Sequence, residues 1–97
     1  MVLHGRGAHG ARPHESADPV LAAGLLIAAL QGIVSRRVNP SVPAVLTVAT
    51  MQAGTASNVI PDHATIGGTL RATDPHTRAL LGDELRRVVA GIALAHD

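Results

Sequence analysis

The fold is decided by one alternating stretch in the second half of the chain, Ala64-Thr65-Ile66-Gly67-Gly68-Thr69-Leu70-Arg71-Ala72. A period of two places the large apolar residues of this stretch on one face and its three polar residues on the other. We therefore expect a strand over 64–72 that is buried on one face, with Arg71 on the polar face.

Two helices with the same type of start lie on either side of this region. Asp18-Pro19 and Asp74-Pro75 each offer an aspartate as N-cap and a proline at the first helical position. The first helix is expected to end at about Ser35. The second helix carries one apolar face, formed by Leu81, Leu85, Val88, Val89 and Ile92. Its solvated side is predicted from Arg78, Asp83, Glu84, Arg86 and Arg87.

Two further strands complete the pattern, a stub at Val2-Leu3-His4 and a long strand over Ala44 to Ala53. The order strand, helix, strand, strand, helix predicts an α+β fold, a ferredoxin-like βαββα(β) two-layer sandwich with both helices on one face of an antiparallel sheet. The closing strand of that fold is missing, which leaves an open edge. We expect residues 1–97 to form a single domain that is a fragment of a larger protein.

Composition excludes several classes of function. The 97 residues include no aromatic residue and no cysteine, and the formal net charge is +1. Base stacking on aromatic side chains, a disulfide framework and a broad basic surface are therefore absent, and we expect neither nucleic acid nor membrane as a partner. The longest apolar run, Val20 to Val34, is shorter than the roughly 20 residues that span a bilayer. Cytoplasm is the default compartment.

The residues with chemical potential gather in a glycine-rich loop over 5–14, which holds three glycines, two histidines and two arginines. Its three glycines allow a tight path with positive φ, so that the backbone can come close to a ligand while His9 is presented for hydrogen bonding. Gly5-x-Gly7-x-x-Gly10 formally matches a dinucleotide fingerprint, but no helix opens directly after it, so nucleotide binding is only a third interpretation. His9 and His14 lack the partners of a metal site, and no metal ligand is predicted.

Three motifs in order resemble the lid (dimerisation) domain of the two-zinc amidohydrolases, the family of aminoacylases, hippurate hydrolases, auxin-conjugate hydrolases and carboxypeptidase G. They are Gly7-Ala8-His9-Gly10-Ala11-Arg12-Pro13-His14, Asn58-Val59-Ile60-Pro61-Asp62, and Arg71. The resemblance implies that His9 donates a hydrogen bond to the scissile carbonyl, while Asn58 and Arg71 bind substrate polar groups, Arg71 taking a carboxylate. On residue type alone, Asn58 as a turn residue and Arg71 as a solvated strand residue are the simpler interpretations.

The resemblance also implies a parent enzyme, a metallo-amidohydrolase that cleaves N-acyl amino acids or small peptides. Its two zinc ions and its catalytic glutamate would lie in a separate domain, so we expect no cofactor and no turnover from residues 1–97 alone. A homodimer is expected through the Ala44–Ala53 edge and the first helix, whose Gly24, Ala28 and Gly32 form a stripe without bulk. The alternative function is a free-standing, non-catalytic ferredoxin-like interaction module.

Strand geometry predicts how such a site would be divided. If the first two strands run in the same direction with the third between them, His9 and Asn58 emerge at one end of the sheet and Arg71 lies at the other. Roughly 25 Å of strand is too far for one small substrate, because each residue adds about 3.3 Å. We therefore expect His9 and Asn58 to reach into the partner's site, with Arg71 serving its own subunit.

Overall fold

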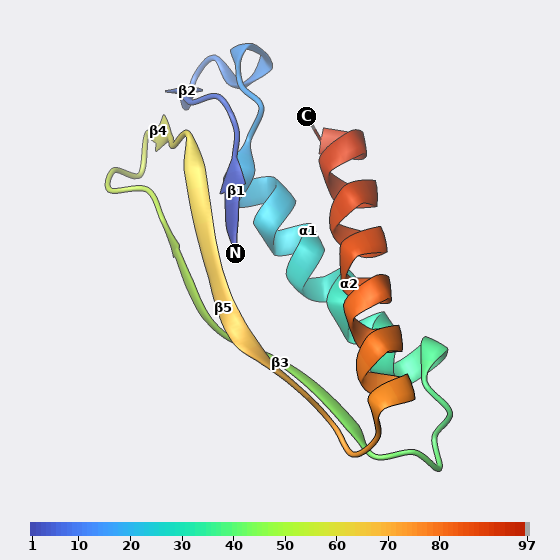
Figure 1. Ribbon diagram of the computed structural model, residues 1–97. Coiled ribbons are helices and arrows are strands. Elements are labelled where there is room, and N and C mark those ends of the chain that lie inside the picture. Colours follow the sequence, from blue (N-terminus) through green and yellow to red (C-terminus); the bar gives the residue numbers. More distant parts are fainter. Residues whose placement is uncertain (97) are drawn as a thin grey trace.

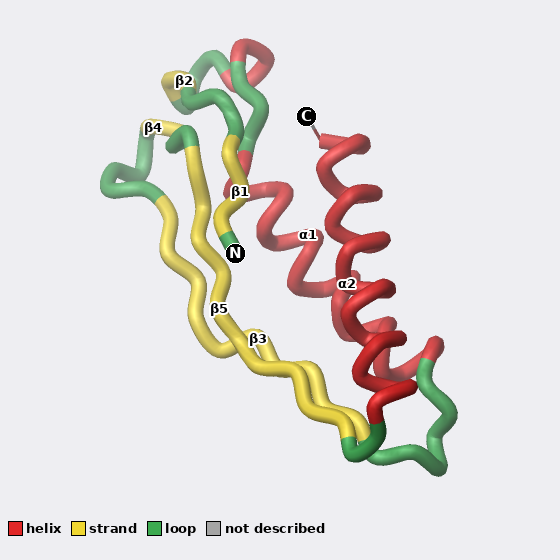
Figure 2. The backbone as a smooth tube through the Cα atoms, viewed as in Figure 1, coloured by secondary structure: helices red, strands yellow, loops and turns green. Residues whose placement is uncertain are grey.

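The computed structural model describes residues 1–96 as two layers, a curved sheet and two helices that cover one of its faces (Figure 1). The distribution of helix, strand and loop along the backbone is drawn in Figure 2. In chain order the elements are β1 (Val2–His4), β2 (Ala8–His9), η1 (Pro13–Glu15), α1 (Pro19–Gly32), η2 (Ile33–Arg37), β3 (Ala44–Ala53), β4 (Val59–Ile60), β5 (His63–Ala72) and α2 (Pro75–His96). The predicted α+β fold class is confirmed.

The main sheet has three strands in the order β1-β5-β3, and β5 is antiparallel to both neighbours. This is the predicted arrangement, in which the last of the three strands, β5, lies between the other two. β3 runs beside β5 for almost its whole length, whereas β1 covers only the beginning of β5. The register of β3 against β5 is shifted by a bulge between Val48 and Thr50. Within the described residues, β3 has no strand on its outer side.

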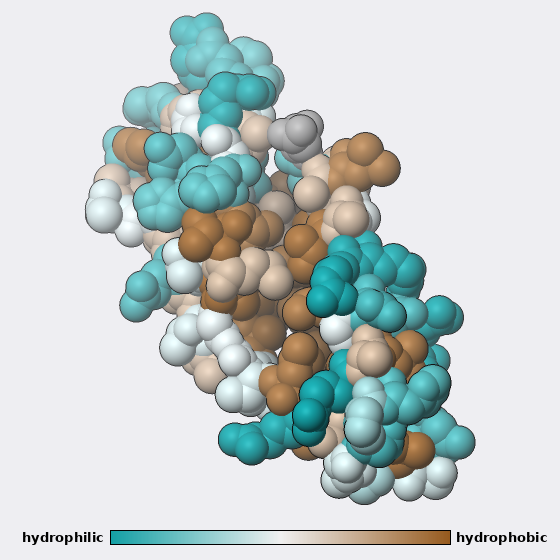
Figure 3. Space-filling view, viewed as in Figure 1, coloured by the Kyte–Doolittle hydropathy of each residue, from teal (hydrophilic) through white to brown (hydrophobic). Residues whose placement is uncertain are grey.

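The core lies between the sheet and the helices, where apolar side chains gather in a band (Figure 3). Leu26, Ile33 and Leu81 are its largest fully buried side chains. Ala64 and Ile66 close it from the sheet, as the alternating stretch predicts. The expected apolar face of α2 packs against this core through Leu81, Leu85, Val88, Val89 and Ile92.

The first helix differs from its prediction at the C-terminal end. Asp18 caps α1 as expected, because its Oδ1 accepts hydrogen bonds from the main-chain N–H groups of Val20 and Leu21. The expected end at about Ser35 falls inside a change of helix type: α1 ends at Gly32, and the π-helical turn η2 carries the helical segment on to Arg37. The extra turn brings the Arg37 guanidinium against α2.

The second helix differs from its prediction at Glu84, which was expected on the solvated side and is buried, with 7% of its surface exposed. Its carboxylate accepts hydrogen bonds from Arg37 (Nη2 to Oε1, 3.1 Å) and from Arg87 (Nε to Oε2, 2.9 Å). Two guanidinium partners make burial of this charge tolerable. The hydrogen bonds from Arg87 and then Arg37 lower the pKa of Glu84, against the burial that raises it.

The α1 helix is apolar on all sides, and its outward side is not covered. Over Pro19–Arg37 the best 18-residue window has a mean hydropathy of 1.6, enough by length and composition alone for a membrane span. One side nevertheless packs into the core, as in a core helix of a globular domain. Val20, Leu21 and Leu25 remain exposed on the other side, by 39%, 54% and 40%. A helix that is hydrophobic all round is normally covered all round.

Candidate functional site

The glycine-rich loop packs against residues 58–62, in the connection between β3 and β5. The Gly5 N–H donates to the Asp62 carbonyl oxygen, and the Gly10 N–H donates to the Asn58 carbonyl oxygen, both at 2.7 Å. Between these bonds β2 pairs with β4, in a two-stranded ladder that no sequence pattern predicts. The loop and the Asn58 motif therefore form one substructure at one end of the sheet.

The expected role of the loop glycines is wrong. Among the described residues, Gly54 alone has a positive φ, at 71°. The loop glycines are needed for close packing of backbone on backbone: a Cβ at Gly7 would lie 2.6 Å from the Ile60 carbonyl oxygen, and one at Gly10 would lie 3.0 Å from that of Asn58. They therefore serve the attachment of the loop.

His9 is exposed at the tip of this substructure, opposite Val59 in the β2–β4 ladder. The Ala11 N–H donates to His9 Nδ1 at 3.0 Å, which makes Nδ1 an acceptor. In a neutral imidazole the other nitrogen then carries the proton, so Nε2–H is available as a donor. Asn58 precedes Val59, and its carbonyl oxygen accepts from the N–H of Gly10, the residue after His9; the Asn58 side chain is also exposed.

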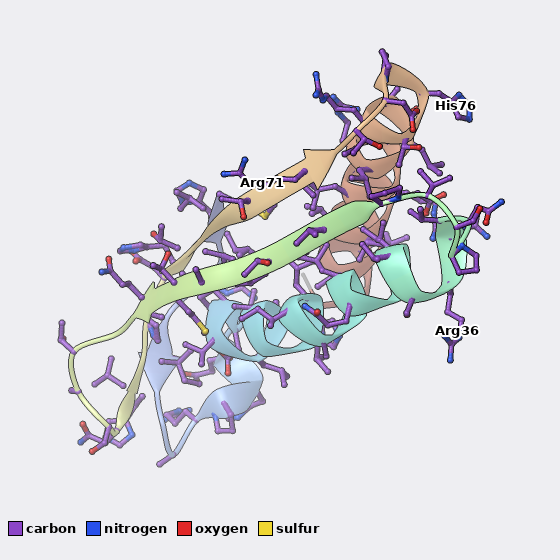
Figure 4. All side chains as sticks on the ribbon, turned by 90° about the horizontal axis from the view of Figure 1, so that it is seen from below. Arg36, Arg71 and His76 are labelled. Carbon is purple, nitrogen blue, oxygen red and sulfur yellow. The ribbon has the colours of Figure 1, made fainter. Side chains whose placement is uncertain are left out.

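Arg71 lies far from this substructure, as predicted. It is exposed on β5 opposite Val45, eight residues beyond His63, which is about 26 Å of strand at 3.3 Å per residue. Figure 4 shows that Arg71, Arg36 and His76 point outward in different directions. The structure thus brings His9 and Asn58 together and separates both from Arg71.

One polar pair that no sequence pattern predicts lies beside the loop. His63 Nδ1 and Asp62 Oδ1 are 2.7 Å apart on neighbouring residues. This hydrogen bond, with the charge of His63, lowers the pKa of the Asp62 carboxyl. The adjacency of Asp and His after Pro61 was the available signal, although adjacency in sequence does not fix the contact.

A metal site needs several His, Cys, Asp or Glu side chains that converge on one point. In the part of the chain that the structure describes, no group of three or more His, Cys, Asp or Glu residues is placed to hold a metal ion. Asp62 and His63 form a pair without a third ligand. The residues present therefore do not fit a dinuclear centre, and no chemical step is assigned to a metal on this chain.

Comparison with known proteins identifies the family. The model of the peptidase dimerisation domain matches residues 1–97. The chain is 48% identical over 93 residues to the hippurate hydrolase of Campylobacter jejuni, covering 96% of this chain and 24% of that protein. It superposes on a Staphylococcus aureus chain described as an aminohydrolase with a TM-score of 0.94 and 32% identity, covering 98% of this chain and 24% of the other.

A second similar solved structure is described as metal-binding. It is a dinuclear metal-binding peptidase of the M20 family from Bacillus subtilis, with a TM-score of 0.65 and 38% identity, covering 81% of this chain and 19% of that one. The chain thus spans about a quarter of the length of the first relatives it matches. With a family model that covers its whole length, the chain belongs to the peptidase dimerisation domain family of the M20 peptidases.

Proposed function

We propose that this chain is the dimerisation and substrate-binding lid of a hydrolase that cleaves an amide bond in N-acyl amino acids or small peptides. The observation that carries the proposal is the match of the whole chain to a peptidase dimerisation domain. The names of its relatives, a hippurate hydrolase among them, favour acyl amino acids as the substrate class. The two divalent ions of such an enzyme, zinc or similar, would be held by another part of a longer protein.

Dimerisation through β3 and α1 is supported by what this chain leaves uncovered. The outer edge of β3 offers unpaired main-chain groups over ten residues. The outward side of α1 carries exposed apolar residues, and a Cβ built at Gly24 or Gly32 meets no atom within 4 Å. A second copy related by a two-fold axis would pair the β3 strands of the two chains and cover the outward side of α1 in each of them.

In the lid, His9 acts as a hydrogen-bond donor to the oxyanion that develops from the scissile carbonyl. A neutral imidazole with its proton on Nε2 suits this role, and the Ala11 N–H favours that tautomer. One well-placed donor of this type contributes roughly 3 kcal/mol to transition-state stabilisation. Asn58 would add a second polar contact from the adjoining segment.

Arg71 binds the substrate carboxylate in this proposal, from the other subunit. Antiparallel pairing about the middle of β3 sets the Arg71 end of one chain beside the His9 end of its partner. Three strand spacings of about 4.8 Å then separate the two β5 strands, or roughly 14 Å. Arginine is a long side chain, so a substrate of a few residues could contact both ends.

The test is the mass of the chain in solution. Light scattering at about 100 μM, well above the dissociation constant of an ordinary weak dimer, is expected to give twice the 9.9 kDa of one chain. A mass of one chain at this concentration would reject the dimerisation part of the proposal. Hydrolysis is tested on the longer protein with hippurate as the first substrate.

A further inference from the structure

A depression of about 370 Å³ lies beside the connection between β3 and β5. The proposed function assigns no role to it. Its polar lining comes from both long strands and from the connection between them over 54–62, and it consists of Gln52, Thr55, Asp62, His63 and Thr65. No arginine is among the lining residues, and the whole chain contains no lysine. Asp62 is the only carboxylate in this lining.

The position of the depression follows from the register of the sheet. Gln52 is opposite Thr65 in the β3–β5 ladder, so the two side chains lie on the same face. By alternation, this is the polar face that also carries Arg71, because the intervening Ala64 and Ile66 are buried in the core. The depression therefore lies on the polar face of the sheet, where a ligand can reach it.

The depression also adjoins the substructure of His9. Val59, which lines it, is the partner of His9 in the β2–β4 ladder. A molecule that accepts a hydrogen bond from His9 could thus extend one of its ends toward Asp62 and His63.

The Asp62–His63 pair defines what this end could bind. Their hydrogen bond uses one carboxylate oxygen and His63 Nδ1, which leaves Asp62 Oδ2 and His63 Nε2 for a ligand. Both side chains are accessible, with 59% of His63 and 77% of Asp62 exposed. The second imidazole nearby is His4, opposite His63 in the β1–β5 ladder. When the imidazoles are neutral, the net charge of this group is −1.

We propose that this depression is a specificity subsite for an amine, with the Asp62 carboxylate binding a positively charged ammonium group at one end of the substrate. The inference rests on the proposed function, of which it names a substrate class: N-acyl amino acids or small peptides that carry a free amine. Asp62 supplies the charge, and His63 holds the carboxylate in place through Nδ1.

The experiment titrates the 97-residue chain, labelled with ¹⁵N, with two probes of nearly equal size, N-acetyl-lysine amide and N-acetyl-norleucine amide. Chemical shifts of the main-chain amides of His63 and Thr65 report binding at pH 7.5. We expect the lysine probe to bind about fivefold more tightly than the norleucine probe, the upper end of what an exposed charge pair contributes. Equal binding of the two probes, or shifts elsewhere without shifts at these amides, would overturn the subsite.

Three variants separate the carboxylate from other effects. Asp62→Asn is expected to bring the ratio of the two affinities close to one, while His63→Gln, which keeps the carboxylate, retains most of the preference. Asp83→Asn is the matched control, because Asp83 is 78% exposed and pairs with Arg86 at 3.0 Å on the solvated side of α2. A loss of preference in Asp83→Asn equal to that in Asp62→Asn would also reject the proposal.

The titration needs neither turnover nor a dimer, so it fails or succeeds separately from the proposed function. A chain that prefers the lysine probe but is monomeric would keep the subsite and reject dimerisation. A dimer that binds both probes with equal affinity would keep dimerisation and reject the subsite.

Discussion

The main-chain N–H of Ala11 donates to Nδ1 of His9 at 3.0 Å, from two residues further along the chain. The bond closes a local turn, in which the Arg12 N–H also donates to the His9 carbonyl oxygen at 2.8 Å. An imidazole that accepts at Nδ1 carries its proton at Nε2 when it is neutral. The backbone of the loop thereby selects the tautomer of its own histidine.

This contact predicts the protonation pattern of His9 in solution. Two-bond ¹H–¹⁵N correlation spectra at pH 8 are expected to show an unprotonated Nδ1 and a protonated Nε2 for His9. His14 in the same loop is the control, because no hydrogen bond to either of its ring nitrogens is present among residues 1–96. A His9 ring that is protonated at Nδ1 would contradict the loop geometry.

A charged side chain on the outward side of α1 is predicted to separate the dimer without unfolding the chain. Gly24→Arg is accommodated within one chain, because a Cβ there meets no atom within 4 Å. Replacing a helical glycine also favours the helix, by roughly 0.7 kcal/mol. Light scattering is expected to give half the mass of the parent, with an unchanged circular dichroism spectrum.

Gly91→Arg is the control for this prediction. Gly91 lies in α2 and is equally open, with no atom within 4 Å of a built Cβ. It is not on the proposed pairing face, so Gly91→Arg is expected to keep the parental mass. Equal effects of the two substitutions would place the interface elsewhere.

The buried carboxylate of Glu84 predicts a loss of stability in acid. Its pKa is lower in the folded chain than in the unfolded chain, because Arg87 and Arg37 bind the ionised form. The contribution is therefore complete above the unfolded pKa, near 4.5, and is lost as pH falls through the folded value. The free energy of unfolding from urea titrations is expected to decrease steadily below about pH 5.

Glu84→Gln is expected to flatten this dependence and to lower stability at pH 7, since the two guanidinium groups lose their ionised partner. Part of the slope will remain, because hydrogen bonds also lower the pKa values of Asp62 and Asp74. Asp83→Asn, one residue away on the exposed side, is expected to change the slope little. A slope in Glu84→Gln equal to that of the parent would show that the Arg37–Glu84–Arg87 contact contributes no pH dependence.

These contacts show which parts of the fold could be predicted from sequence. Both helix starts follow from aspartate-proline caps, β5 follows from a period of two, and β3 follows from its content of Val, Thr and Leu. The structure places all four within one residue of expectation. The burial of Glu84 could not be predicted in this way, because its partner Arg37 is 47 residues distant. The β2–β4 ladder was missed because two residues per strand carry no periodicity.

The candidate site was predictable only in part. The separation of Arg71 from His9 followed from strand order and length, which the sequence supplies. The attachment of the loop to Asn58 depends on main-chain bonds between residues almost fifty positions apart, which no local pattern encodes. The three glycines of the loop predict a tight backbone path, and the reason that glycine is needed there is backbone packing rather than positive φ.

The last prediction is that two subunits share each site in the longer protein. His9→Ala is expected to lower kcat by roughly 100-fold or more, because one donor to the oxyanion is lost. His14→Ala, in the same loop, is the control and should stay near the parental rate.

The subunit-exchange experiment needs a second inactive protein, which carries an intact lid and a substitution that inactivates the remainder of the enzyme. When the two inactive dimers exchange subunits, every heterodimer combines one intact catalytic part with His9 from the opposite subunit. One of the two sites in each heterodimer would then be complete, because the other site holds the inactivated catalytic part and receives the His9→Ala lid. Activity should therefore return as exchange proceeds, and exchange is followed independently by native mass spectrometry. Complete exchange without any return of activity would mean that His9 serves its own subunit, and the shared site would be rejected.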